Sequence, residues 1–179
     1  MPYDERHPIV TGDLLAGKGE ASGRLAVCEV ALYGTVPVAP VRADVDALIA
    51  GGVCAFKISS FEAHPHRFPR IDNAATRTLI EMLAGSGLPL GLHNEDQEIV
   101  RALARQFKDS GRVAPVDHSP SRPEVAELAA TATFLSLGAG EPTPLHIVHI
   151  STPAGFALVR QQHDAGAPVT GEMCVHYLH

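Results

Sequence analysis

Several residue types are scarce in this sequence, and each scarcity excludes a class of protein. Tryptophan is absent, aromatic residues make up 5% of the 179 positions, and Lys and Arg number 14 against 20 Asp and Glu. The net charge of −6, without any cluster of basic residues, argues against a nucleic-acid-binding surface. Every apolar run is much shorter than the roughly 20 residues that a membrane helix needs. We therefore expect a protein that binds neither nucleic acid nor a membrane.

Cysteine is also scarce, and the three cysteines lie far apart at Cys28, Cys54 and Cys174. Their odd number and the lack of a C-x-x-C pair argue against a disulfide framework and against a thiolate zinc site. Residues 1–8 carry charges where a secretory signal has an apolar core, so we expect a reducing, cytoplasmic location. With 45% hydrophobic and 19% charged residues, the composition is typical of one globular domain. The ten histidines are a first indication of metal chemistry.

Short β-type runs alternate with longer helical stretches along the whole chain. The predicted strands cover residues 24–33, 53–59, 88–93, 145–151 and 169–177, and the predicted helices cover 44–50, 73–84, 97–108, 122–137 and 153–165. Asp72 and Thr152 are predicted helix N-caps, the second followed by Pro153 at the first helical position. Five β/α units in series predict a parallel sheet covered by helices, in either an open doubly wound sheet or a closed barrel.

Three successive predicted strands end in residues that could bind a metal: Lys57, His93 and His149. Ligands in parallel α/β folds gather at the carboxyl ends of the strands, so we expect these side chains to point into one cavity. Side chains alternate across a strand, and the apolar neighbours Phe56 and Ile58 predict that Lys57 points to the inside of the sheet.

Burial of Lys57 would lower its pKa, and a neutral amine can form a Schiff base, act as a base or capture CO2 as a carbamate. The alternative is a lysine at the strand edge that reaches water. His93 taken alone would more often be a hydrogen-bonded core histidine than a ligand. The acidic residues Glu95 and Asp96 that follow it suit the start of a helix and need have no other role.

The remaining histidines are weaker candidates. His146 precedes His149 by three residues, so in a regular strand the two side chains face opposite sides. We predict His149 as the ligand and a structural role for His146. The pair His64 and His66 has the H-x-H spacing of zinc hydrolases but lies in a predicted loop, where solvated histidines are the usual case. The glycines around Lys18 do not have phosphate-loop spacing.

Five stretches resemble motifs of the cyclic amidohydrolases, the family of allantoinase, dihydroorotase and hydantoinase. These stretches, in order, are residues 31–34 (ALYG), 52–57 (GVCAFK), 92–96 (LHNED), 146–151 (HIVHIS) and 171–178 (GEMCVHYL). The last differs from the family's ETCPHYL at Met173 and Val175. The resemblance implies a TIM-type (β/α)8 barrel, of which residues 1–179 would form one partial domain holding the third to seventh units.

The resemblance also implies an activity, a cofactor and ligands. A carboxylated Lys57 would bridge two zinc ions, and His93 and His149 would bind the second ion. The implied reaction is hydrolysis of a cyclic amide C–N bond, an allantoinase- or dihydroorotase-like ring opening of a small cyclic ureide or imide. The full-length protein would be a homo-oligomer.

Two ligand sets of the family have no counterpart in this sequence: the H-x-H of the first strand and the Asp of the eighth. A (β/α)8 barrel needs around 250 residues, so we expect an interior segment that is inactive alone. It should associate through open sheet edges near residues 26–31 and 169–177, and expose apolar side chains such as Ile147 and Leu90 or its neighbours on its inner face. The alternative is a non-catalytic homologue that serves as a structural or assembly partner.

Overall fold

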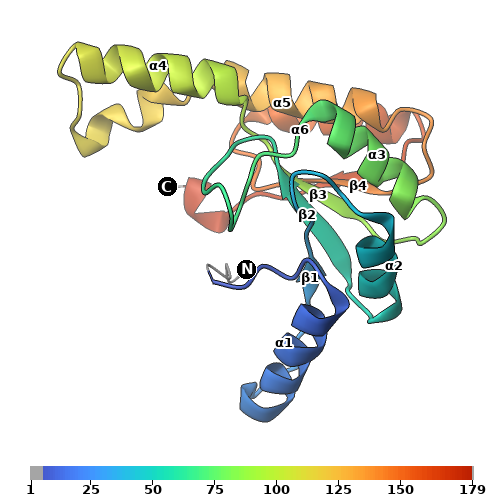
Figure 1. The fold of residues 1–179 in the computed structure, drawn as a ribbon. Helices are drawn as coiled ribbons and strands as arrows, with labels where there is room; N and C mark the ends of the chain where they lie inside the picture. Colours follow the sequence, from blue (N-terminus) through green and yellow to red (C-terminus); the bar gives the residue numbers. More distant parts are fainter. Residues whose placement is uncertain (1–5, 179) are drawn as a thin grey trace.

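The structure is a computed structural model that describes residues 6–178, and its centre is a parallel sheet (Figure 1). The strands are β1 (Tyr33–Gly34), β2 (Ala55–Ser59), β3 (Leu90–His93), β4 (Leu145–Val148) and β5 (Val169–Gly171). Each strand pairs with the next in the chain, so the order across the sheet is β1-β2-β3-β4-β5. This order never reverses, whereas a doubly wound sheet has a point at which it does.

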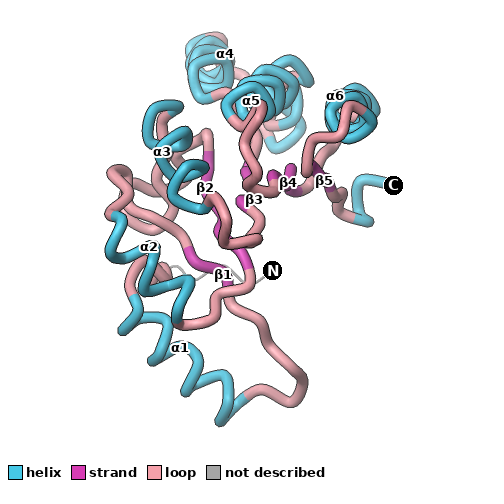
Figure 2. Tube along the Cα trace, turned by 90° about the vertical axis from the view of Figure 1, so that its right-hand side faces the viewer, coloured by secondary structure: helices cyan, strands magenta, loops and turns pink. Residues whose placement is uncertain are grey.

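Among the described residues, five of the six α-helices connect successive strands, and the other precedes β1. The helices are α1 (Gly12–Leu25), α2 (Arg42–Ala50), α3 (Asn73–Leu83), α4 (Gln97–Asp109), α5 (Glu124–Leu137) and α6 (Pro153–Asp164), with short 3-10 turns η1 (Pro115–Asp117), η2 (Ser119–Ser121) and η3 (Val175–Leu178). Figure 2 shows the strands as an arc with α2, α3, α5 and α6 along its convex side. An arc of consecutive parallel strands with helices outside is part of a (β/α) barrel, as the family resemblance implied. Across residues 6–178, no helix is long and apolar enough to cross a membrane.

The two faces of the sheet differ in chemistry. Its helix-covered face carries side chains that are almost fully buried, namely Phe56, Ile58, Leu90, Leu92, Leu145 and Ile147. On the inner face, strand register places Lys57, Gly91, His146 and Thr170 in one row. The predicted alternation around Lys57 is therefore confirmed. The prediction that Ile147 and Leu90 are exposed on the inner face is wrong, because both side chains have the opposite parity and pack against the helices.

The first predicted strand, at residues 24–33, is also wrong. Residues up to Leu25 belong to α1, which begins after Thr11, whose hydroxyl accepts a hydrogen bond from the Leu14 N–H. The strand itself is only Tyr33–Gly34. Four glycines lower the helix propensity of α1 and interrupt the apolar periodicity that would indicate a helix. The apolar residues that follow therefore favour a strand in the sequence pattern.

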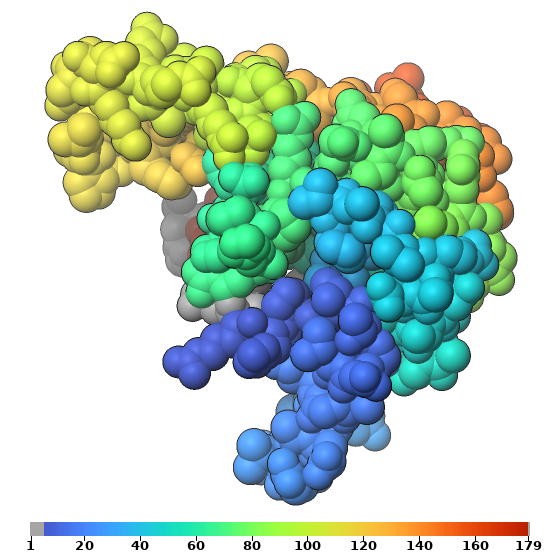
Figure 3. Space-filling model, in the orientation of Figure 1, coloured from blue at the N-terminus to red at the C-terminus, as the bar shows by residue number. Residues whose placement is uncertain are grey.

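Other boundaries are close to those predicted. Asp72 and Thr152 are confirmed as N-caps, since their side chains accept hydrogen bonds from Ala75 N and Gly155 N. The last strand is shorter than predicted and ends at Gly171. Figure 3 shows α4 and the residues after it (yellow) as a lobe that projects from the body of the protein, with α1 (blue) projecting elsewhere.

Candidate functional site

Two of the three predicted ligands meet at the carboxyl ends of neighbouring strands. His93 is the last residue of β3, and His149 directly follows β4. The Nδ1 atom of His93 lies 2.8 Å from Nε2 of His149, and the two rings meet at 67° with their centroids 4.7 Å apart. The structure thus brings together two imidazoles that are 56 residues apart in the sequence.

The backbone at His149 explains this contact and corrects the prediction for His146. His149 has a φ of 47°, the one positive value among the described non-glycine residues, so strand alternation ends before it. His146 shares the inner-face row with Lys57, and its Nδ1 lies 2.8 Å from the Thr170 hydroxyl. The argument that His146 and His149 must face opposite sides is therefore wrong, because it assumed a regular strand through His149.

Lys57 lies on the same face, one strand away from His93. Its backbone pairs with Gly91, two residues before His93, and its Nζ lies 5.8 Å from the centroid of the Phe68 ring. That ring in turn stands edge-on to His93 at 6.0 Å. Burial lowers the pKa of Lys57, against the opposing effect of Glu172 and Cys174. The amine is therefore easier to deprotonate than a solvated lysine.

His149 is held in its neutral form. Its pKa is lowered to about 4, first by burial and then by the nearby charges of His93 and Lys57. Because charge on Lys57 affects His149, the lysine lies within electrostatic reach of the histidine pair. At neutral pH the His149 ring therefore carries a single proton and one nitrogen lone pair.

Glu95 is a member of the site that the sequence interpretation assigned only to the helix start. Its Oε2 lies 2.9 Å from Nε2 of His93, and its Oε1 lies 3.0 Å from Nε of Arg122. Burial raises the pKa of Glu95, but the hydrogen bond and charge of His93, together with Arg122, outweigh burial and lower it. The helix cap is instead Asp96, whose carboxylate accepts from the Ile99 N–H.

The two-residue spacing of His93 and Glu95 is a sequence signal that could have predicted Glu95 as part of the site. Residues two apart in extended chain point the same way, so His93 and Glu95 share a side. Asn94, between them, points into the helical layer, where it is 2% exposed and donates to the Thr131 hydroxyl at 2.9 Å. Arg122 carried no such local signal, because it lies 27 residues beyond Glu95 in the sequence.

The histidine pair fits a zinc ion in chemistry and nearly in geometry. If His93 donates its Nε2 proton to Glu95, its Nδ1 presents a lone pair toward His149. Tetrahedral zinc with Zn–N distances of about 2.1 Å separates two ring nitrogens by about 3.4 Å. The observed 2.8 Å needs to open by only a fraction of an ångström, a small rotation of the two side chains.

Other donors are few near this pair. Within the part of the chain that the structure describes, no group of three or more His, Cys, Asp or Glu side chains is placed to hold a metal ion. Lys57 and His146 lie on this face, and Glu172 is close enough to affect the pKa of Lys57. His64 is engaged elsewhere, since its Nδ1 accepts hydrogen bonds from the backbone N–H groups of His66 and Arg67 in its own loop.

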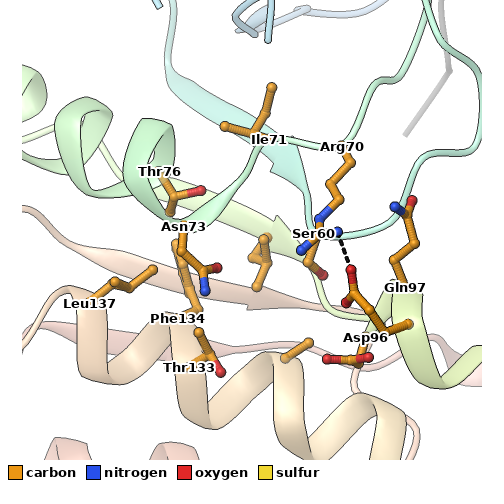
Figure 4. A pocket seen from close by; sticks show the side chains of 13 residues that line it. Ser60, Arg70, Ile71, Asn73, Thr76, Asp96, Gln97, Thr133, Phe134 and Leu137 are labelled. Carbon is orange, nitrogen blue, oxygen red and sulfur yellow. Dashed lines mark hydrogen bonds and ion pairs between the residues drawn. The ribbon is translucent and has the colours of Figure 1, made fainter. Parts of the chain in front are cut away.

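A separate cavity of about 110 Å³ lies on the helical side of the sheet (Figure 4). Its lining includes Arg70, Asn73, Asp96, Thr133 and Phe134, which come from the loop before α3, the starts of α3 and α4, and α5. Arg70 forms an ion pair with Glu98 at its rim. None of the three predicted ligands lines this cavity, so it is distinct from the candidate site.

No family model matches the chain. The chain is 32% identical over 178 residues to an allantoinase of Solibacter usitatus and 34% identical over 179 residues to an allantoinase of Rubrobacter xylanophilus, in each case across 99% of this chain and 39% of the relative. A D-hydantoinase of Streptomyces coelicolor is 30% identical over 135 residues, covering 75% of this chain and 28% of the relative.

Solved structures show the same fold. The L-hydantoinase (dihydropyrimidinase) of Arthrobacter aurescens superimposes with a TM-score of 0.88 at 24% identity, over 93% of this chain and 37% of that one. A D-hydantoinase superimposes with a TM-score of 0.84 at 23% identity, over 98% and 38%. The chain thus spans about two fifths of the length of the proteins it matches, and the predicted partial coverage is confirmed.

Proposed function

This chain belongs to the cyclic amidohydrolase family, and from that premise we propose that the protein hydrolyses a C–N bond of a cyclic ureide or imide. The reaction is an allantoinase- or dihydroorotase-like ring opening. The observation that carries the proposal is the convergence of His93 Nδ1 and His149 Nε2 on the sheet face that also holds Lys57. Allantoinase is the name of several curated relatives, which favours a cyclic ureide as substrate.

In this proposal His93 and His149 hold a zinc ion, and Lys57 as a carbamate holds that ion together with a second one. When bound, the metal brings the pKa of water toward about 7 and polarises the substrate carbonyl. The proton shared across the 2.8 Å contact between His93 Nδ1 and His149 Nε2 must leave that contact as the ion enters, and a neutral His149 ring can carry it on Nδ1. The observation that Glu95 accepts from His93 supports this division of roles.

The environment of Lys57 supports the carbamate. Burial favours the neutral amine, whose lone pair forms a bond to the carbon of CO2 while one N–H proton leaves to solvent. The product is an anion with two oxygens, near the acidic side chain of Glu172. Like charges repel, so the carbamate should persist only when cations share its oxygens. Carboxylation of Lys57 and metal loading are therefore expected to occur together.

The test is a lysine substitution in protein expressed from its complete coding sequence. Lys57→Ala should abolish hydrolysis of allantoin, dihydroorotate and hydantoin with zinc in excess, and Lys108→Ala, on the exposed surface of α4, should not. Full activity of zinc-saturated Lys57→Ala would exclude the bridging role. Activity that persists after removal of metal by a chelator would exclude metal dependence. A folded, zinc-loaded protein that opens none of these rings would favour the non-catalytic alternative.

The predicted cytoplasmic location and homo-oligomeric state belong to the same proposal. They rest on the sequence and on the family resemblance, and remain predictions.

A further inference from the structure

Glu95 is the centre of a hydrogen-bonded chain that starts at His93 and ends at Arg122. One carboxylate oxygen faces Nε2 of His93 at 2.9 Å, and the other faces Nε of Arg122 at 3.0 Å. All three side chains are mostly shielded, with exposed fractions of 25%, 21% and 31% for His93, Glu95 and Arg122. Both partners of the carboxylate are hydrogen-bond donors, so neither oxygen is left without one.

The backbone around Glu95 is fixed as well. The Ser60 hydroxyl accepts from the Glu95 N–H at 3.1 Å and lies 2.8 Å from the His93 carbonyl oxygen. Arg122 directly follows η2 and stands 5.5 Å from the centroid of the Phe61 ring. The loop after β2 thus fixes the backbone of Glu95, and the segment before α5 holds its carboxylate through Arg122.

The tautomer of His93 depends on this contact. A neutral imidazole carries its single proton on either Nδ1 or Nε2. A carboxylate at Nε2 favours the proton there and leaves the lone pair on Nδ1, the atom that faces His149. Without that acceptor, the proton can move to Nδ1, where it blocks any cation between the two rings.

We infer that Glu95 and Arg122 are positioning residues, which set the tautomer and orientation of His93 so that its Nδ1 is available to a metal ion. The inference rests on the proposed function, since it needs His93 as a ligand. Arg122 acts through Glu95, and Glu95 acts through His93. Neither residue contacts the metal.

The experiment measures zinc affinity by competition with a chelator, in protein expressed from its complete coding sequence. Glu95→Gln keeps the shape of the side chain but offers one oxygen to two donors, so either His93 or Arg122 loses its acceptor. We expect zinc affinity to fall about 10- to 100-fold, as for other partners of metal-binding histidines. Arg122→Met should cause a smaller loss, because Glu95 keeps its contact with His93.

The matched control is Glu62→Gln. Glu62 forms an ion pair with Arg101 at 3.0 Å on the nearby surface, and that pair touches neither histidine. This control should keep zinc affinity within about 2-fold of wild type, since exposed ion pairs contribute little. The melting temperature of each metal-free variant should stay near that of wild type, while the increase on adding zinc should shrink only for Glu95→Gln and Arg122→Met.

The possible results distinguish failure of this inference from failure of the proposed function. If His93→Ala loses zinc but Glu95→Gln and Arg122→Met bind it as wild type does, the positioning role is wrong and the proposed function stands. If His93→Ala keeps both zinc and turnover, His93 is not a ligand and the positioning role is wrong, although the hydrolysis stands. Wild-type protein that binds zinc but opens no ring would contradict the proposed function. Weakened binding in Glu95→Gln but not in Glu62→Gln supports the inference.

Discussion

The lowered pKa of His149 predicts a loss of stability in mild acid. In the folded protein this pKa is about 4, against 6.5 for a solvated histidine. The unfolded chain therefore takes up a proton as pH falls through 6.5, while the folded protein resists protonation until about pH 4. The contribution of His149 to the free energy of unfolding is fully present above about pH 7. It is lost as pH falls through the interval between the unfolded pKa of 6.5 and the folded pKa of about 4.

The two pKa values give the magnitude of the effect. Their difference corresponds to about 3.4 kcal/mol between the fully neutral and fully protonated states. Between pH 7 and pH 5 the linkage relation gives a loss of about 2 kcal/mol. The His149 ring is partly exposed, and solvent screening reduces this figure, so we expect about 1.5 kcal/mol.

The assay is urea unfolding of metal-free protein at pH 7 and pH 5, comparing wild type with His149→Asn. Asparagine suits this position because it tolerates the positive φ of 47° better than most residues. The variant should lose about 1.5 kcal/mol less than wild type between the two pH values. His163→Asn, at an exposed position near the end of α6, should follow wild type. An equal loss in wild type and His149→Asn would refute the reasoning.

Further predictions concern the supports of the site and residues 1–179 on their own. Glu127 accepts hydrogen bonds from Ser151 N at 2.9 Å and from the Thr152 hydroxyl at 2.7 Å, just after His149. Glu127→Ala should therefore lower the free energy of unfolding by about 1–3 kcal/mol, as measured by chemical denaturation, and weaken zinc binding. An unchanged free energy of unfolding and unchanged zinc affinity would contradict this. Residues 1–179 alone should associate through the edges at β1 and β5 and show no ring opening, as checked by size-exclusion chromatography with metal analysis. A monodisperse monomer with two zinc equivalents and activity on hydantoin would contradict it.

Local signals in the sequence were sufficient for much of the fold. The caps at Asp72 and Thr152 depend on hydrogen bonds to backbone N–H groups three residues away, so their residue types predict them. The inward direction of Lys57 follows from the parity of Phe56 and Ile58, because side chains alternate along any regular strand. The succession of β/α units has the same origin. Apolar periodicity fails only where glycines obscure it, as in α1.

Contacts between distant segments were decided by the tertiary structure. His149 faces His93 because the chain leaves strand geometry at a single residue with φ of 47°, which no pattern of residue types around it indicates. Glu95 meets Arg122 because the segment before α5 packs beside the end of β3. Residue types determine hydrogen bonds that close within a turn or strand. A contact across 27 or 56 residues depends on the packing of whole elements, so the sequence indicated the candidate ligands but not their orientation or the residues that contact them.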